Sequence, residues 1–375
     1  MKQTAIYIHI PFCDHKCIYC DFYSIINYDN LHNYLSAIKK EIELRGKEFS
    51  EDREVISIFF GGGTPSFMLP EYIGEIIKSI NNNFSVRNDA EITLETNPGT
   101  VNKKKLKEFL SVGINRISIG IQSFNDDELK FLTRIHDSQT AIETVNSAAE
   151  SGFNNISIDL IFNLPSQTKK MWRKNLDIAV GLPITHISAY SLILERGTIL
   201  KKMVLDGKVQ MQDPDHDADL YETTIKVLTE NEFIQYEVSN FAKNNLECIH
   251  NNAYWRYKDY LGFGTSAHSF INGKRWWNYS SLNFYLEKMN NYNPIAGEEI
   301  LTNNQMHDEY IMLAMRSYGL DINEYIKRFG SIWISKVKND LSEYQTKGYL
   351  SIDDKFIKFT PKGYTLCDEI ISKLL

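Results

Sequence analysis

Three cysteines near the N-terminus have a spacing that points to a metal site. Cys13, Cys17 and Cys20 form a Cys-x3-Cys-x2-Cys pattern, and the other two cysteines, Cys248 and Cys367, lie far away in the sequence. Thiolates in so dense a cluster need a bridging partner or a metal, and three is an odd number for disulfides. We therefore predict that Cys13, Cys17 and Cys20 bind metal.

Two kinds of metal site are compatible with these cysteines. The first is a structural zinc site with His9 or His15 as the fourth ligand, although structural zinc more often uses two separated Cys-x2-Cys arms. The second is a four-iron cluster, in which three thiolates leave one iron open to a ligand that is not part of the protein. The spacing favours the iron cluster.

The strands and helices predicted around these cysteines follow the pattern of a parallel α/β fold. Short β-branched runs alternate with amphipathic segments over the first two thirds of the chain. We predict strands at 5–10, 55–60, 91–95, 116–119, 155–159 and 186–190. We predict helices at 29–46, 70–82, 103–111, 138–151 and 168–180.

Polar or glycine-rich residues stand at the end of each predicted strand. They are the cysteine cluster, 61–65, 95–98, 120–124, Asp159 and 190–191. Ligands of parallel α/β proteins bind at the carboxyl ends of the strands, so these residues should meet at one face. The glycines at 61–63 would let backbone atoms approach a ligand closely. We therefore predict a single site.

The cysteine spacing and the glycine run together resemble the radical S-adenosylmethionine (SAM) proteins. Further motifs, spread over essentially the whole chain, are similar to the oxygen-independent coproporphyrinogen III oxidase family. They are Tyr7-x-His9-Ile10-Pro11-Phe12-Cys13, Gly61-Gly62-Gly63-Thr64-Pro65-Ser66, Glu95-x-Asn97-Pro98, Arg116-x-Ser118-x-Gly120-x-Gln122-Ser123-Phe124, Arg134-x-His136 and Asp159-Leu160-Ile161. The resemblance implies an α/β fold with a partial (β/α)6 TIM-like radical SAM barrel. It also implies a [4Fe–4S] cluster on the three cysteines, with SAM chelating the open iron.

The resemblance implies two groups of SAM-binding residues at the matching positions. Those that would contact the cluster-bound SAM are Tyr7, Gly62, Thr64 and Glu95. Those that would line the neighbouring pocket, which in the oxidase holds a second SAM, are Tyr19, Gly63, Gln122, Arg134 and Asp159. A carboxylate suits ribose hydroxyls or an ammonium group, and an arginine suits a carboxylate.

The sequence departs from the oxidase in two places. Asp21 and Phe22 follow Cys20, where the oxidase has another cysteine, and only six residues precede Tyr7, where the oxidase has a longer extension. Both departures resemble the haem chaperone branch of the family, the HemW-type proteins. The stretches 236–242, 250–255 and 262–268 also fit that branch.

The stretch 250–255 has the His-Asn-x-x-Tyr-Trp pattern that is associated with haem binding in this branch. The resemblance therefore implies haem as a ligand, with His250 as its axial ligand ahead of His268. A neutral imidazole is a good haem ligand, and Tyr254 and Trp255 offer flat apolar area against a porphyrin. From the residues alone, a histidine beside aromatic residues is more often packed and hydrogen-bonded in a core.

The chain divides into a barrel at 1–235, a connecting segment with the haem motif at 236–300, and a C-terminal domain at 301–375. We predict helices at 304–317, 321–328 and 331–347, strands at 349–352 and 356–360, and a helix from about 361. This order is typical of an α+β winged-helix-like domain. Such a domain could bind DNA, but the mixed charges favour packing against the barrel, and we expect no DNA partner.

Composition limits the location and the partners. The chain is 43% apolar and has a formal net charge of −7, which argues against nonspecific nucleic-acid binding. It has no uninterrupted apolar run of about 18 residues and no hydrophobic signal segment, so we expect a cytoplasmic protein without a transmembrane segment. Any peripheral membrane association would be through the haem acceptor.

The resemblance implies a haem chaperone that binds haem and transfers it to an acceptor protein. Two enzymatic alternatives remain open, and no catalytic residue is assigned for either. One is an oxygen-independent coproporphyrinogen III oxidase, a radical SAM decarboxylase. The other is a radical SAM methyltransferase acting on a tetrapyrrole. A regulatory protein that binds DNA through the winged helix is a third alternative.

Overall fold

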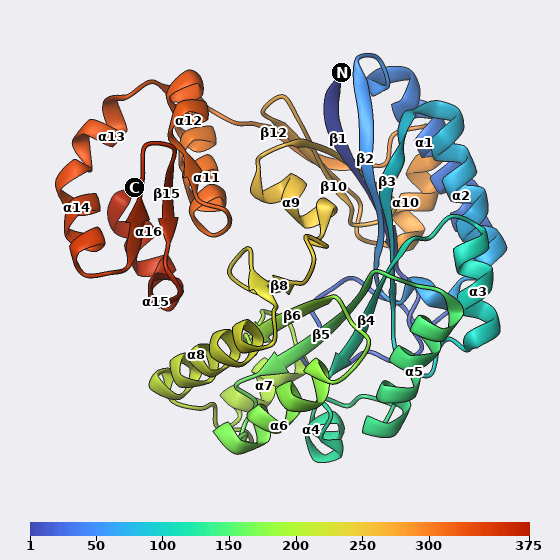
Figure 1. Ribbon diagram of the computed structural model, residues 1–375. Helices are drawn as coiled ribbons and strands as arrows, with labels where there is room; N and C mark the ends of the chain where they lie inside the picture. Colours follow the sequence, from blue (N-terminus) through green and yellow to red (C-terminus); the bar gives the residue numbers. More distant parts are fainter.

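Six parallel strands form the centre of the molecule (Figure 1). The computed structural model describes residues 1–375. The strands are β1 (Lys2–Ile10), β2 (Arg53–Gly62), β3 (Ser85–Thr96), β4 (Arg116–Gln122), β5 (Ile156–Phe162) and β6 (His186–Ser191). Each pairs in parallel with the next, in chain order. All six predicted strands are present, and the predicted partial (β/α)6 barrel is confirmed.

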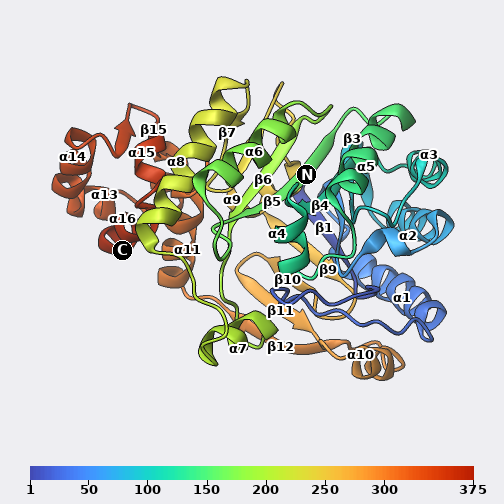
Figure 2. The same cartoon turned by 90° about the horizontal axis from the view of Figure 1, so that it is seen from below.

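Helices connect these strands and cover the outer face of the sheet (Figures 1 and 2). The five predicted helices are α1 (Leu31–Phe49), α2 (Pro70–Asn83), α3 (Lys103–Ser111), α5 (Ser138–Ser151) and α6 (Lys169–Val180). Four further helices were not predicted. They are α8 (Pro214–Glu230), which follows the sixth strand, and the short elements η1 (Pro65–Phe67), α4 (Asp126–Phe131) and α7 (Ile199–Leu205).

Side chains alternate along the parallel strands between the helices and the barrel interior. On β4, Ile117, Ile119 and Ile121 are buried in the apolar core that the helices share. Side chains of a strand point to opposite faces in turn, so Arg116 and Ser118 point the other way, into the barrel. The interior is therefore polar, and chemistry-bearing residues collect there.

Residues 234–300 extend the same sheet on both sides, where the sequence analysis assigned no strands. The added strands are β7 (Ile234–Gln235), β8 (Asn240–Ala242), β9 (Asp259–Phe263), β10 (His268–Ile271), β11 (Lys274–Asn278) and β12 (Ile295–Ile300). β9 pairs in parallel with β1, and β8 pairs antiparallel with β6. Two further helices, α9 (Ile249–Trp255) and α10 (Leu282–Met289), lie in this segment.

The C-terminal quarter has its own apolar core and a three-stranded sheet. Its elements are α11 (Asn303–Met315), β13 (Leu320–Asp321), α12 (Ile322–Phe329), α13 (Ile332–Lys336), α14 (Lys338–Thr346), β14 (Leu350–Ile352), β15 (Phe356–Phe359), α15 (Pro361–Tyr364) and α16 (Cys367–Leu374). We call residues 301–375 the C-terminal module. Its helix α15 contacts α8, and the two lie side by side in Figure 2. The backbone N–H of Val238 also donates to the carbonyl oxygen of Arg316 at 2.9 Å. The helices predicted at 331–347 and from 361 are each divided in two.

Candidate functional site

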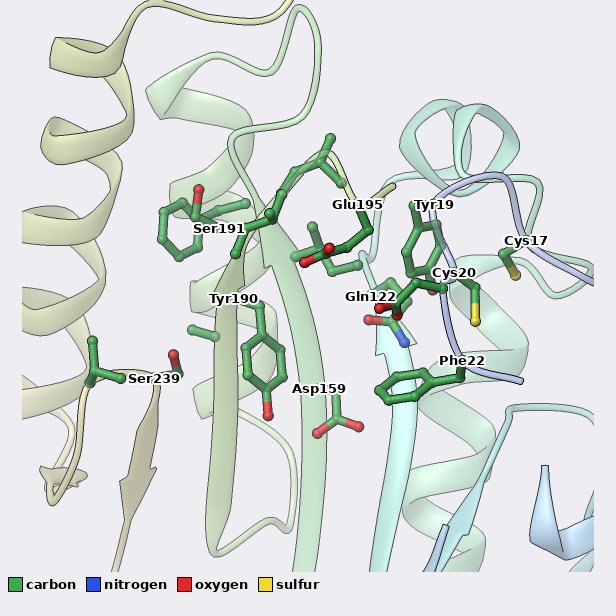
Figure 3. Close-up of a pocket in the computed structure, with 18 of the residues that line it drawn as sticks. Cys17, Tyr19, Cys20, Phe22, Gln122, Asp159, Tyr190, Ser191, Glu195 and Ser239 are labelled. Atoms are coloured by element: carbon green, nitrogen blue, oxygen red, sulfur yellow. The ribbon is translucent and has the colours of Figure 1, made fainter. Parts of the chain in front are cut away.

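The carboxyl ends of the parallel strands open into a cavity of about 850 Å³. Most of the predicted site residues line it: Cys13, Cys17, Tyr19, Cys20, Gly62, Gly63, Thr64, Glu95, Gln122, Arg134 and Asp159. Figure 3 shows Asp159 and Tyr190 between the cysteine loop, with Cys17 and Cys20, and Ser239 on the opposite side. Tyr7 and His250 are not among the lining residues.

The loop that carries the cysteines is held by backbone hydrogen bonds. It closes on itself through Cys13 N–H to Ile25 O at 2.9 Å and Ile25 N–H to Pro11 O at 2.8 Å. The glycine run holds it from the side, because Gly63 N–H donates to Ile10 O at 2.7 Å and Thr64 N–H donates to Phe12 O at 2.8 Å. The cysteine loop and the glycine run therefore form one unit.

The three sulfurs of the motif have separate surroundings. The sulfur of Cys13 lies 3.2 Å from Thr64 Oγ1 and 2.9 Å from the carbonyl oxygen of His15, and the sulfur of Cys17 lies 3.7 Å from Nη1 of Arg134. Burial raises the pKa of the Cys20 thiol to about 11.

The three thiols supply a donor set that fits a multi-iron cluster. All three cysteines are free and line the same cavity. A zinc ion needs four ligands around one point, whereas each thiolate of a four-iron cluster binds a different iron. The residues present fit a cluster with one open iron.

Two glycines allow the glycine run to pack against the cysteine loop. Gly62 has φ +114°, and a Cβ atom there would lie 2.6 Å from the ring of His9. A Cβ atom on Gly63 would lie 2.6 Å from the carbonyl oxygen of Phe12. Gly62 also donates its N–H to Oε2 of Glu95 at 3.2 Å, so the run positions this carboxyl group.

Two half-buried carboxyl groups, Glu95 and Asp159, line the cavity. Burial, reinforced by the charge of Asp159, raises the pKa of Glu95 to about 8. Burial also raises the pKa of Asp159, although hydrogen bonds from Ser188 and Ser118 and the charge of Arg116 oppose that rise. Glu95 is therefore mostly protonated at neutral pH and can donate a hydrogen bond to a ligand as well as accept one.

Tyr7 lies beneath the glycine run instead of lining the cavity. Its hydroxyl is 3.2 Å from Nδ1 of His9, and its ring stacks on Phe59 with 6.3 Å between centroids. A Cβ atom on Gly61 would lie 3.0 Å from the Tyr7 ring. Tyr7 thus supports the backbone of the run from below.

His250 is buried in the barrel interior, away from the cavity, with only 2% of its surface exposed. Its Nδ1 lies 3.1 Å from Ser57 Oγ, and its Nε2 lies 2.9 Å from the Tyr254 hydroxyl. Its ring stacks on Phe59 at 4.9 Å, and burial together with Arg116 lowers its pKa to about 3. With both nitrogens bonded, the ring as placed has no free lone pair for a haem iron.

The segment around His250 is anchored to the sheet by one carboxylate. Glu91 of β3 accepts hydrogen bonds from the backbone N–H groups of Ile249 and His250, at 3.2 and 3.1 Å. The other candidate, His268, is exposed and stacks on Trp277 outside the cavity. Neither histidine is brought to the cavity.

The cavity contains residues that the predicted site did not include. Asn97 bridges Thr64 and Arg134 by hydrogen bonds. The sequence could have indicated it, because Asn97 belongs to the Glu95-x-Asn97-Pro98 motif. The C-terminal module contributes residues 364–369, including Cys367. No sequence signal could have assigned these residues to the site, because they lie more than a hundred residues away from every other lining residue.

The lining of the cavity is acidic. Only Lys16 and Arg134 contribute lysine or arginine charge. Seven carboxylic side chains line the same space: Asp21, Glu95, Asp159, Glu195, Asp217, Asp368 and Glu369. Two of the seven are already paired with cations outside the lining, Asp368 with Arg316 at 2.6 Å and Glu369 with Lys373 at 2.8 Å. The other five still outnumber Lys16 and Arg134, so the lining offers more partners to a cationic ligand than to an anionic one.

Comparison with known proteins identifies the type of domain and the relatives of the whole chain. Residues 7–179 match the radical SAM superfamily. The chain is 32% identical to the heme chaperone HemW of Bacillus subtilis (strain 168), over 100% of this chain and 99% of that protein. It is 40% identical to the HemW of Haemophilus influenzae over 72% of this chain and 70% of that one.

Two further similarities concern a longer relative and a solved fold. The chain is 40% identical to radical S-adenosyl methionine domain-containing protein 1, mitochondrial, of Danio rerio, over 71% of this chain and 60% of that longer protein. The solved structure of coproporphyrinogen III oxidase (HemN) from Escherichia coli covers 100% of this chain with a TM-score of 0.83 at 24% identity, over 90% of that chain. This last similarity shows the fold.

No helix of the protein has the length and apolar character needed to cross a membrane.

Proposed function

This chain belongs to the heme chaperone HemW family of radical SAM proteins, and we propose that it binds haem and transfers it to an acceptor protein. The observation that carries the proposal is the similarity to the Bacillus subtilis heme chaperone, which extends over the whole chain and includes the C-terminal module. The cofactors would be a [4Fe–4S] cluster, SAM and haem.

The cluster would be held by Cys13, Cys17 and Cys20, and SAM would occupy the adjoining part of the cavity. When bound, these groups supply one-electron chemistry. Glu95, held by Gly62 N–H, is available to ribose hydroxyls or to the ammonium group of SAM. The acidic lining suits SAM, because SAM carries positive charge on its sulfonium and ammonium groups.

Haem coordination by His250, which the family motif implies, would require α9 to move. The ring must leave its bonds to Ser57 and Tyr254 and its stack on Phe59. The movement must also break the hydrogen bonds from the N-terminus of α9 to Glu91 and the contacts of this short helix with β1, β2 and β9, but it need not unfold a strand. We include this movement in the proposed haem-binding state.

The second candidate function is decarboxylation of coproporphyrinogen III, and the fold of the Escherichia coli enzyme is its support. The lining of the cavity counts against it. The substrate carries four carboxylates, whereas the cavity offers only Lys16 and Arg134 as cationic partners for them, beside a larger number of carboxylic side chains. A chaperone could leave the two haem carboxylates in solvent, whereas the decarboxylase must bring propionates to the reacting centre.

One experiment separates the two functions. The reconstituted protein is incubated anaerobically with SAM, a reductant and coproporphyrinogen III, and the same preparation is titrated with haem. We expect stoichiometric haem binding, transfer of that haem to an apo-haemoprotein, and no decarboxylated product. Formation of protoporphyrinogen IX would establish the oxidase instead. Absence of both product and haem binding would overturn the proposed function.

We propose that the C-terminal module packs against the barrel and does not bind DNA. Residues 301–375 contain ten Lys or Arg and ten Asp or Glu, so they carry no net charge with which to neutralise phosphates. Its residues 364–369 form one wall of the cavity. Salt-sensitive binding of duplex DNA would contradict this assignment.

A further inference from the structure

A chain of side-chain contacts connects the sulfurs of Cys13 and Cys17 through three other residues. The sulfur of Cys13 is 3.2 Å from Thr64 Oγ1, and Thr64 Oγ1 is 2.9 Å from Nδ2 of Asn97. On the other side of the amide, Oδ1 of Asn97 is 2.7 Å from Nη2 of Arg134. Nη1 of the same guanidinium is 3.7 Å from the sulfur of Cys17.

The chemistry of the arginine sets the direction of the bonds that Asn97 makes to Arg134 and Thr64. A guanidinium can only donate, so the atom of Asn97 that faces it must be the carbonyl oxygen. The amide nitrogen of Asn97 then faces Thr64 and donates to its oxygen. The hydroxyl hydrogen of Thr64 is left free to donate to the sulfur of Cys13. A thiolate can only accept, so as cluster ligands the sulfurs of Cys13 and Cys17 would each have one donor within reach.

The position of Arg134 is fixed independently of any ligand. Its Nη2 also donates to the carbonyl oxygen of Gly120 at 2.6 Å, so both hydrogens of that nitrogen are in use. Gly120 leaves the room that this arrangement needs, because a Cβ atom there would lie 3.0 Å from Oδ1 of Asn97. A bidentate contact with a SAM carboxylate would need two nitrogens of the guanidinium, and one of them is already fully hydrogen-bonded within the protein.

We propose that Arg134, Asn97 and Thr64 tune the reduction potential of the cluster by donating hydrogen bonds to the sulfurs of Cys13 and Cys17. Asn97 is the positioning residue, because its amide holds both donors in their orientation. This role differs from a contact with a second SAM, which the position of Arg134 implies in the oxidase family. The inference rests on the proposed cluster.

The expected effect on the potential has a definite sign. Reduction adds one electron to the cluster and its thiolates, and hydrogen bonds and a nearby cation stabilise the added negative charge. Removing these donors should therefore make the cluster harder to reduce. The full charge and the donor of Arg134 should contribute more than the single hydroxyl of Thr64.

The test is a redox titration of the reconstituted full chain in the absence of SAM. Electron paramagnetic resonance measures the reduced cluster at each potential. Omitting SAM keeps any loss of a SAM contact out of the result. The variants are Arg134→Gln, which removes the charge, Asn97→Ala, which removes the bridge, and Thr64→Val, which removes the hydroxyl. Arg173→Gln is the matched control, because Arg173 lies on α6 and pairs only with Asp177 at 2.8 Å.

We expect Arg134→Gln to lower the ratio of reduced to oxidised cluster at a given potential by at least tenfold, which is about 59 mV for a one-electron couple. Asn97→Ala and Thr64→Val should lower the reduction potential as well, and Thr64→Val should cause the smaller change. Arg173→Gln should leave the potential unchanged. Variants with full iron content and the wild-type potential would overturn the inference. If Arg134→Gln assembles no cluster, the reduction potential of Thr64→Val tests the inference, and a wild-type value there would overturn it.

The wild-type protein separates this inference from the proposed function. If the wild-type chain assembles no four-iron cluster, the proposed cofactor is wrong, and the inference falls with it. If the wild-type chain assembles the cluster and the variants keep its potential, only the inference fails. Haem titration of the same samples reports on the chaperone function, because none of the three residues is proposed to contact haem.

Discussion

Nε2 of His250 lies 2.9 Å from the hydroxyl oxygen of Tyr254, four residues further along the chain, inside the barrel. Tyr254→Phe removes this partner and leaves a buried ring nitrogen unpaired. We expect the free energy of unfolding to fall by about 1–3 kcal/mol, as measured by urea denaturation. Tyr292→Phe is the control, because Tyr292 is exposed, and it should change stability little. Equal stability of the two variants would mean that the hydrogen bond contributes nothing.

Haem loading should release α9 from the barrel. Because His250 has both nitrogens bonded in the structure, ligation of iron has to break its contacts with Ser57 and Tyr254. We expect faster amide hydrogen exchange in residues 249–255 of the haem-loaded protein, and an altered Soret band in His250→Ala. Unchanged exchange together with a wild-type Soret band in His250→Ala would place the haem elsewhere.

The stability of the ligand-free protein should depend on Glu95 as the pH rises. Its pKa in the folded chain is about 8 against an ordinary value of 4.5, so between these values the folded state holds a proton that the unfolded state has released. The contribution of Glu95 is complete below about pH 4.5 and is lost as the pH rises through 8. The loss amounts to at most about 1.4 kcal/mol per pH unit.

Glu95→Gln removes this titration. The unfolding free energy of Glu95→Gln minus that of the wild type should therefore increase between pH 5 and pH 8, as measured in matched urea titrations. A flat difference for Glu95→Gln would contradict the raised pKa.

A side chain at position 62 should disturb the cysteine loop. Gly62→Ala strains a backbone at φ +114° and places a Cβ atom 2.6 Å from the ring of His9. Gly113→Ala is the matched control, because it has φ +107° but nothing within 4 Å of its Cβ atom. We expect reconstituted Gly62→Ala to bind less iron than Gly113→Ala, measured as iron and sulfide per chain. Equal iron content would show that the contact with His9 is relieved without moving the loop.

The proposed cluster ligands can be distinguished from Cys367, the other cysteine that lines the cavity. Cys17→Ala should lose most of the iron and sulfide, because a three-thiolate site cannot lose a ligand without weakening the cluster. Cys367→Ala should retain both, although Cys367 lines the same cavity from the C-terminal module. Full iron content in Cys17→Ala would overturn the ligand assignment. Loss of iron in Cys367→Ala would add a ligand from the opposite wall.

Much of the fold could be predicted because its signals are local. The alternation of β-branched runs and amphipathic segments located all six parallel strands and the five helices between them. The strands 234–300 escaped prediction, because they are short and form only by pairing with edges that the barrel provides, such as β9 along β1. The spacing of Cys13, Cys17 and Cys20 likewise predicted a metal site without any knowledge of the fold.

Only the tertiary structure decided which of the candidate residues meet. A His-Asn-x-x-Tyr-Trp pattern does not show whether its histidine faces a cavity, and the fold buries His250 between Ser57 and Phe59. The bond between Arg134 and Cys17 joins residues 117 positions apart, and Cys367 reaches the cavity from the last helix. Local sequence determines residue chemistry and periodicity, whereas burial and contacts between distant residues depend on how the elements pack.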